Sequence, residues 1–285
     1  MNWKDNFPKE NRYFETENGI LYEGDAVEQL KQIPDESIDL VITSPPYDNM
    51  RFYSATNDKE LKTIWNFEKF KIIAKELYRI VKKGGIVVWI VGDATINGSE
   101  TGNSFRQALY FKDKCGFNIH DTMIFEKTGF NFPSKNRYHQ IFEYMFVFSK
   151  GKPKTFNPII DRKNKWKGSW GNTMVRQKDG SLKNMGKTTL NKYGKRLNIW
   201  RIKNGKGFAH KDQLAYKHPA TFPESLAKDH IISWSNENNV VLDTLCGSGT
   251  TLKMAEKLGR KWIGIEINKE YCEIAKQRIL TLKKE

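Results

Sequence analysis

Hydrophobic residues are grouped along the chain in short runs separated by longer stretches with helical spacing. Four runs of strand length are almost continuously apolar, which is typical of strands buried on both faces of a parallel sheet. They are residues 37–42 (SIDLVI), 86–93 (IVVWIVGD), 240–245 (VVLDTL) and 261–268 (KWIGIEIN). This pattern predicts the central strands of an α/β protein.

Helices are predicted between these runs. Apolar residues share one helical face over 65–81, and Gly84 and Gly85 are expected to end that helix. Further helices are expected over 103–115 and 269–283, and further strands over 19–25, 119–126 and 141–148. Because strands alternate with helices, the predicted fold is a doubly wound, mostly parallel sheet.

Positive charge is concentrated in one part of the chain. The formal net charge is +15, and residues 151–206 contain 16 Lys and Arg against two Asp, which gives 16 − 2 = +14. A block of this kind predicts a surface that binds phosphates. The alternative is a solvated basic linker, but four large aromatic residues in the block argue against it. They are Trp166, Trp170, Tyr193 and Trp200.

Cysteine content and the N-terminal residues exclude some classes of protein. The three cysteines have no paired or zinc-binding spacing, so we expect a reducing cytoplasm and no metal site. The first residues are polar, and no apolar run has the length of a membrane helix. Cys115 and Cys272 are expected to be packing residues on helices.

A glycine turn follows the strand predicted at 240–245. Gly247 and Gly249 suit a backbone that approaches a ligand closely, and a helix is expected directly after them. Glu266 lies in the next predicted strand, where a carboxylate can accept hydrogen bonds from both hydroxyls of a ribose. The unit therefore predicts a site for a nucleoside cofactor.

A second turn follows the strand predicted at 37–42 and reads Ser44-Pro45-Pro46-Tyr47. Two prolines fix φ and make the turn stiff, so its carbonyl directions are preset. Such a turn can direct a hydroxyl, a carbonyl and an aromatic face at a planar substrate. The alternative is a plain strand-ending turn.

In this order, the proline turn and the motif Asp243-x-x-Cys246-Gly247-Ser248-Gly249-Thr250-Thr251 resemble those of bacterial DNA amino-methyltransferases of the β arrangement. Gly24-Asp25, the segment 218–223 (HPATFP) and Gly264-Ile265-Glu266 also match that family. The resemblance covers nearly the whole chain. It implies a circularly permuted, Rossmann-like methyltransferase fold with S-adenosylmethionine as cofactor. Cys246 departs from the family, which usually has Phe there.

The resemblance also implies roles for individual residues. Asp25 would accept from the adenine amino group of the cofactor, and Glu266 would bind the ribose. The remaining cofactor-binding residues would be Thr221, Phe222, Pro223, Asp243, Cys246, Gly247, Gly249, Thr250 and Thr251.

The catalytic residues would be Ser44, Pro45, Pro46 and Tyr47, which act on an exocyclic amino group of a base flipped out of double-stranded DNA. Ser at the first position of the tetrapeptide is typical of enzymes that methylate cytosine N4, whereas Asp or Asn is typical of adenine N6 enzymes. We therefore expect cytosine N4, with adenine N6 as the alternative. Both turns are expected to open into one cleft at the carboxyl edge of the sheet.

The chain is expected to divide into a catalytic half (1–150), an inserted DNA target-recognition region (151–206) and a cofactor-binding half (207–285). Phe52 is expected, with Asn49 and Arg51, in a mobile loop over the flipped base. Tyr138 and His139 are expected, with Arg137, in a loop that approaches the substrate strand, and a structural role is the alternative for His139. The candidate DNA-contacting residues are Asn49, Arg51, Arg137, Lys165, Trp170, Arg176, Lys195 and Arg196.

Other functions and partners stay open at this point. Methyltransferases of RNA or of protein glutamine carry Asn-Pro-Pro-Tyr with the cofactor motif before it, which is the reverse of the order here. A non-catalytic DNA-binding module is a further alternative. The resemblance suggests a bacterial or phage-encoded protein of a restriction–modification system, with a homodimer and a separate cognate endonuclease as candidate partners.

Overall fold

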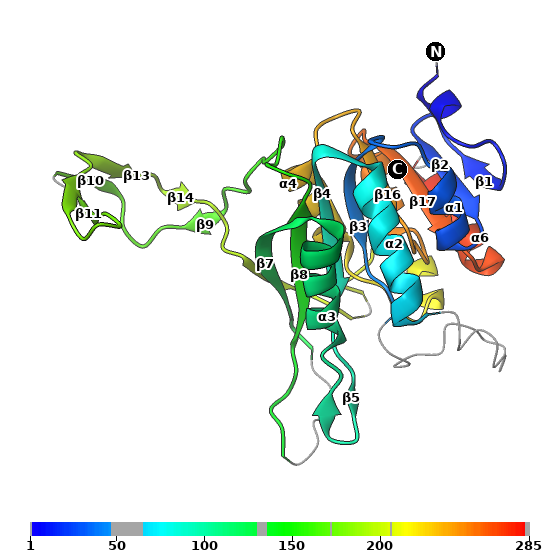
Figure 1. The fold of residues 1–285 in the computed structure, drawn as a ribbon, viewed down its shortest axis with the longest axis horizontal. Coiled ribbons are helices and arrows are strands. Elements are labelled where there is room, and N and C mark those ends of the chain that lie inside the picture. Colours follow the sequence, from blue (N-terminus) through cyan, green and yellow to red (C-terminus); the bar gives the residue numbers. More distant parts are fainter. Residues whose placement is uncertain (1, 47–64, 130–135, 172, 206, 283–285) are drawn as a thin grey trace. The chain divides into compact units, whose positions relative to one another are not determined.

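The computed structural model describes residues 2–46, 65–129, 136–171, 173–205 and 207–282 (Figure 1). A nine-stranded sheet forms its centre, with the strand order β1-β2-β17-β16-β3-β4-β8-β7-β15. In that order the strands are Arg12–Glu15, Gly19–Glu23, Lys261–Glu266, Val240–Asp243, Ile38–Thr43, Val81–Val91, Phe142–Ser149, Asn118–Lys127 and Ile199–Ile202.

Five neighbouring strands of this sheet are parallel. Each of β2, β17, β16, β3 and β4 pairs in parallel with the next. The strand β8 is antiparallel to both of its neighbours, and β1 is antiparallel to β2. The chain moves outward in one direction from β16 to β17 and in the other from β3 to β4. The predicted doubly wound, mostly parallel fold is thus confirmed, and its switch point lies between β16 and β3.

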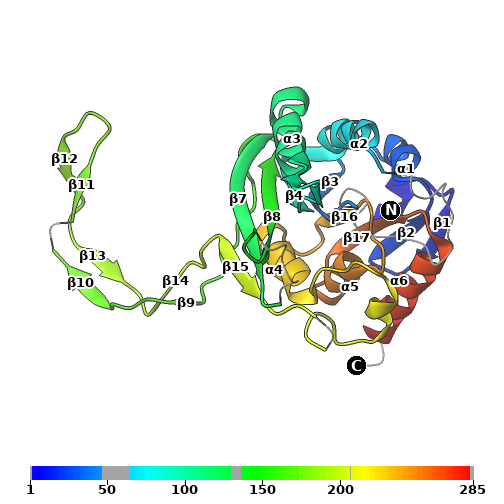
Figure 2. The same cartoon turned by 90° about the horizontal axis from the view of Figure 1, so that it is seen from below.

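Helices cover both faces of the sheet. Figure 2 shows α1, α2 and α3 along one face and α4, α5 and α6 along the other. The helices are Ala26–Gln32, Phe67–Ile80, Asn103–Tyr110, Glu224–Trp234, Thr250–Lys257 and Lys269–Thr281, and α3 continues into the π-helical turn Phe111–Cys115. None of the helices in the described residues has the length and apolar character of a membrane span.

An aromatic cluster anchors the first helical layer on the sheet. The ring of Phe111 lies 5.2 Å from that of Trp89 on β4, 5.3 Å from Phe70 on α2 and 4.6 Å from Phe148 on β8. All four side chains are buried. Burial of each such ring stabilises the fold by about 1.5–3 kcal/mol, so this cluster fixes α2 and the π-helical turn against β4.

The glycine pair Gly84-Gly85 does not end a helix, and that prediction was wrong. The helix α2 ends at Ile80, and both glycines lie inside β4. Gly84 has φ +82° and donates to Lys150 O at 2.6 Å, where a side chain would collide with Lys154. Pairing of β4 with β3 shifts register at this point. The glycine pair therefore forms an irregularity at which β4 can bend. Glycine is common both at such irregularities and at helix ends, so its position in the sequence does not distinguish the two.

The chain divides into two compact units. Unit 1 comprises residues 1–157 and 198–285, and unit 2 comprises residues 158–197. These bounds are narrower than the predicted insertion 151–206, because β15 pairs with β7 and Asn157 donates to Ser233 O in unit 1.

Unit 2 consists of short two-stranded ribbons. They are β9 with β14 (Arg162–Lys163, Tyr193–Gly194), β10 with β13 (Gly168–Trp170, Thr188–Leu190) and β11 with β12 (Met174–Arg176, Leu182–Asn184). Side chains of β11 and β12 are exposed on both faces. Ribbons with so little buried surface are marginally stable in water by themselves.

Candidate active site

The proline turn and the glycine turn begin at the ends of neighbouring strands. β3 and β16 are parallel, with Leu40 opposite Val241. Beyond this pairing, Thr244 Oγ1 donates to Thr43 Oγ1 at 3.2 Å, and Thr251 Oγ1 lies 3.4 Å from Ile42 O. Both turns therefore lie at one edge of the sheet, as expected from the switch point.

The proline turn is described as far as Pro46. Ser44 follows Thr43 directly and is half-buried, while Pro45 is buried and Pro46 is half-buried. Tyr47, Asn49, Arg51 and Phe52 lie outside the described residues, so their predicted roles stay predictions.

The glycine turn is held by backbone hydrogen bonds and requires glycine at two positions. Cys246 N donates to Ile265 O at 3.0 Å, and Gly249 N donates to Cys246 O at 2.7 Å. Gly247 and Gly249 have φ +50° and +74°, in the left-handed region. A Cβ at Gly247 would lie 2.8 Å from His218 Nε2, and one at Gly249 would lie 2.7 Å from Ala275 Cβ.

Glu266 ends β17 with its carboxylate beside this turn. Oε2 accepts from Gly247 N and Oε1 accepts from Asn268 N, both at 2.8 Å. Burial raises the pKa of Glu266 to about 7, although these backbone N–H groups oppose the shift. Each carboxylate oxygen can accept more than one hydrogen bond, so the group is suited to take further donors such as hydroxyls.

Asp243 is a second buried carboxylate, at the end of β16. Only 1% of its surface is exposed, and burial raises its pKa to about 6, against hydrogen bonds from Thr251 and Thr43. Its Oδ1 also accepts from Leu245 N at 3.3 Å. Two carboxylates with raised pKa at one sheet edge are typical of a functional site.

The segment 218–223 lies against the glycine turn. The His218 ring packs at 4.3 Å from that of Tyr271, and its Nδ1 accepts from Ala220 N at 3.2 Å. Thr221 Oγ1 lies 2.7 Å from His210 Nε2. Phe222 is half-buried, and the buried Pro223 is the N-cap residue of α4. Cys246 is also buried, which raises its pKa well above that of an exposed thiol.

Asp25 has structural partners for both oxygens. Oδ1 accepts from Val27 N at 2.8 Å and caps α1, and Oδ2 accepts from Lys69 Nζ at 2.6 Å. The ion pair connects α1 with α2. Its predicted contact with the cofactor adenine stays a prediction and would use the remaining acceptor capacity of these oxygens.

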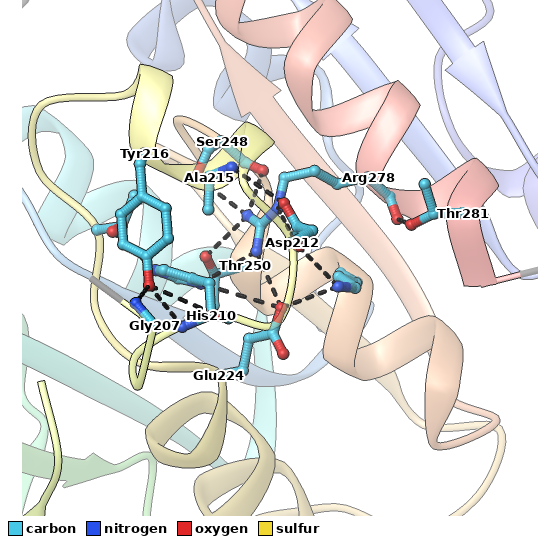
Figure 3. Close-up of polar contacts among 12 residues, drawn as sticks. Gly207, His210, Asp212, Ala215, Tyr216, Glu224, Ser248, Thr250, Arg278 and Thr281 are labelled. Atoms are coloured by element: carbon cyan, nitrogen blue, oxygen red, sulfur yellow. Dashed lines mark hydrogen bonds and ion pairs between the residues drawn. The ribbon is translucent and has the colours of Figure 1, made fainter. Parts of the chain in front are cut away.

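A buried charged cluster behind the glycine turn was missed from the sequence. Arg278 and Lys253 ion-pair with Asp212 and Glu224, and Arg278 also donates to Ser248 O (Figure 3). One signal was available. Arg278 lies at helical spacing on the apolar face of the last helix, with Tyr271, Cys272, Ala275 and Ile279.

The candidate DNA contacts have different environments. Arg137 donates to Gly98 O and lies 3.9 Å from Glu100. Arg196 pairs with Asp161 within unit 2, at 2.5 Å. Lys165, Arg176 and Lys195 are exposed. The backbone of Trp170 pairs with Thr188 in a ribbon. Tyr138 is fully exposed.

Comparisons with known proteins agree with this geometry. The DNA methylase family of N6 and N4 methyltransferases matches residues 38–277. The orphan methyltransferase M.BamHII of Bacillus amyloliquefaciens is 54% identical over 257 residues, which cover 87% of this chain and 91% of that protein. The type II methyltransferase M.BamHI of the same organism is 31% identical over 285 residues, and the match covers 94% of this chain and 58% of that longer protein.

A solved structure shares the fold. The cytosine-N4-specific PvuII DNA methyltransferase superposes with a TM-score of 0.69 at 24% identity, over 95% of this chain and 89% of that one. The protein is therefore a DNA methyltransferase of the amino-methyltransferase family, which is dependent on S-adenosylmethionine.

The residues present fit this cofactor. The turn requires glycine at Gly247, where a side chain would collide with His218, and Glu266 offers a buried acceptor pair of the kind that binds ribose hydroxyls. Within the described part of the chain, no group of three or more His, Cys, Asp or Glu residues is arranged to hold a metal ion.

Glycine can be required for its left-handed φ alone or also because an added side chain would collide with a neighbour. Substitution distinguishes these two requirements. Gly249→Ala combines a left-handed φ with a Cβ collision at Ala275, and we expect a loss of about 3 kcal/mol or more. Gly259→Ala is the matched control, because it has φ +66° and no atom within 4 Å of the added Cβ. It should cost only about 1–2 kcal/mol. Urea unfolding measures both, and equal losses would show that the contact with Ala275 is unimportant.

Proposed function

We propose that the protein transfers a methyl group from S-adenosylmethionine to the exocyclic N4 of cytosine in double-stranded DNA. The observation that carries this proposal is the shared sheet edge of Ser44 and the glycine turn, fixed by the Thr43–Thr244 contact at 3.2 Å. Amino transfer needs the acceptor nitrogen and the methyl donor together, so two binding turns at adjacent strand ends suit it.

Residues of the glycine turn and of segment 218–223 would hold the cofactor. Glu266 would accept the ribose hydroxyls, and Gly247 and Gly249 would let the backbone approach closely. Asp243, Cys246, Thr250, Thr251, Thr221, Phe222 and Pro223 would line the site, and Asp25 would reach the adenine. When bound, S-adenosylmethionine supplies an electrophilic methyl group on a sulfonium.

The proline turn would orient the base. The lone pair of the amino nitrogen is delocalised into the ring, so this nitrogen is a poor nucleophile. Base pairing in the duplex also buries the amino group, so the base must be flipped out at a cost of a few kcal/mol. The hydroxyl of Ser44 and the carbonyl of Pro45 would accept the two amino hydrogens, which localises the lone pair on nitrogen. Tyr47 would stack on the ring, and Pro46 keeps the turn stiff.

Cytosine is preferred over adenine because of Ser44 at the first position of the tetrapeptide, which is typical of N4 enzymes in the family that this chain resembles. N6 of adenine is the second candidate, since the same acceptors can hold its amino group.

DNA would be bound by unit 2 and by the loops at the active edge. Residues 158–197 contain 11 Lys and Arg against two Asp, a net of 11 − 2 = +9. Two-stranded ribbons fit the major groove of DNA. Arg176 and Trp170 would contact DNA from these ribbons, and Lys165 and Lys195 would contact it from the residues beside them. Arg196 would act mainly through its pair with Asp161. Asn49, Arg51 and Arg137 would act near the base.

Further aspects of the biology rest on the family resemblance. We propose a cytoplasmic role in bacterial or phage DNA modification, with a homodimer and a separate cognate endonuclease as partners to be tested.

The base can be identified by mass spectrometry of nucleosides from DNA incubated with the protein and S-adenosylmethionine. We expect N4-methylcytosine, whereas N6-methyladenine would overturn the choice of base.

Ser44→Ala should lower kcat by about tenfold to a hundredfold, because it removes one strong hydrogen bond to the amino group. Its affinity for the cofactor should stay unchanged, and full activity of this variant would contradict the role of Ser44.

Cofactor affinity should depend on pH through Glu266. Its pKa is about 7 in the free protein, and hydroxyl donors favour the ionised form, so binding lowers this pKa and releases a proton below pH 7. Affinity should therefore fall from pH 8 to pH 6, by up to about tenfold per pH unit below 7. Calorimetric titration measures this, and Glu266→Gln should abolish the dependence between pH 8 and pH 7, where Asp243, with a pKa of about 6, stays mostly ionised. An unchanged pH profile in Glu266→Gln would exclude this carboxylate.

The basic ribbons should set the salt dependence of DNA binding. Lys165→Gln with Lys183→Gln removes two exposed cations of unit 2. We expect the slope of log K against log salt to fall by about 0.9 for each lost phosphate contact. Lys31→Gln with Lys276→Gln is the control in unit 1, where both lysines pair with glutamates on their own helices. Equal slopes for both double variants, by fluorescence anisotropy, would contradict the placement of the phosphate-binding surface.

A further inference from the structure

Arg278 is a charged side chain with no exposed surface. It comes from α6, near the end of the described chain, and 0% of its side chain is accessible. Burial of an unpaired guanidinium would cost several kcal/mol, so such a group persists only where nearly all its donors have partners. Figure 3 shows the guanidinium among acceptors from separate segments of unit 1.

The donors of Arg278 divide among three segments. Nη1 donates to Ser248 O at 2.7 Å and to Ser248 Oγ and Thr250 Oγ1 at 3.1 Å, all in the glycine turn or at the start of α5. Nε donates to both carboxylate oxygens of Asp212 at 3.1 Å. Nη2 donates to Glu224 Oε1 at the start of α4, at 3.1 Å. One planar group therefore joins the glycine turn to the residues on both sides of segment 218–223.

A contact through His210 extends this network to Thr221. Nη2 of Arg278 lies 3.1 Å from His210 Nδ1, and since a guanidinium can only donate, Nδ1 is the acceptor. The ring proton is then on Nε2, which donates to Thr221 Oγ1 at 2.7 Å. Thr221 is one of the residues to which we assign the cofactor.

The network is balanced in charge. Lys253 Nζ donates to Asp212 at 2.8 Å and to Glu224 at 2.9 Å, so two cations face two carboxylates. Burial opposes ionisation of Asp212, but Lys253 and Arg278 lower its pKa to about 2. For Glu224, burial likewise opposes ionisation, while Lys253 and Arg278 lower the pKa to about 2. The cluster therefore stays fully charged at neutral pH.

We propose that Arg278 is a positioning residue for the cofactor site, which holds the glycine turn and segment 218–223 in register through a single guanidinium. The inference rests on the proposed assignment of the cofactor to these two segments. Lysine cannot replace this function, because its three donors radiate from one point and cannot reach Ser248, Asp212 and Glu224 in a fixed plane.

The test compares Arg278→Lys with a matched control, Arg79→Lys. Arg79 also donates to backbone carbonyls and carboxylates, among them Ile33 O at 2.8 Å and Glu76 at 2.6 Å, but it connects α1 and α2 on the opposite face of the sheet. Arg278→Lys should weaken S-adenosylmethionine binding by about tenfold to a hundredfold, the effect of one or two lost charge-assisted hydrogen bonds. The KM for the cofactor should rise while kcat and the affinity for DNA change little. Arg79→Lys should leave cofactor binding unchanged.

Hydrogen–deuterium exchange of the cofactor-free proteins gives an independent readout. Arg278→Lys should speed exchange in 207–223 and 247–251 and leave α1 and α2 unchanged, whereas Arg79→Lys should do the reverse. Wild-type cofactor affinity in Arg278→Lys, or uniformly faster exchange, would overturn the proposal.

If Arg278→Lys does not fold, Asp212→Asn is judged by the same two measurements. It keeps the guanidinium but removes the negative charge and one acceptor oxygen of its partner, so a smaller change of the same kind is expected. No change in either readout would overturn the proposal. Absence of cofactor binding by the wild-type protein would instead contradict the proposed function.

Discussion

The parallel pairing of β3 with β16 is the constraint on which the site depends. These strands come from opposite ends of the chain, yet they lie side by side and end together, where the hydroxyls of Thr43 and Thr244 meet. A shift of one residue in this pairing would turn every side chain to the other face and move Ser44 away from the glycine turn. The strand order around the switch point therefore places a proline turn near the start of the chain beside a glycine turn near its end.

Charge at this edge is kept in an apolar environment. Burial raises the pKa of both Asp243 and Glu266, and backbone N–H groups hold the Glu266 carboxylate before any ligand arrives. Preset acceptors lose little freedom when a ligand binds, which is the general advantage of preorganisation. Behind the turn, the cluster around Arg278 is instead fully compensated and stays ionised. Asp243 and Glu266 are thus suited to binding a ligand, and the cluster around Arg278 is suited to holding the glycine turn in place.

Much of the fold and the location of the site were predictable from the sequence. Strands such as 240–243 and 261–266 are apolar enough to be recognised, and the motifs mark their carboxyl ends. Contacts that depend on three dimensions were not predictable: Gly84 and Gly85 read as a helix end because glycine serves both uses, and Asp25 gave no sign of its pair with Lys69. Arg278 was hidden because charged residues are expected to be exposed, although its position on an apolar helical face marked it.

The central claim is that one edge of the sheet binds both the methyl donor and the target base. A crystal structure of the protein with S-adenosylhomocysteine and a DNA duplex carrying its recognition site tests this claim most directly. We expect the nucleoside at Gly247 and Glu266, with the amino group of an extruded cytosine at Ser44 in the same cavity. A nucleoside bound away from the glycine turn, or a target base remote from the proline turn, would contradict it.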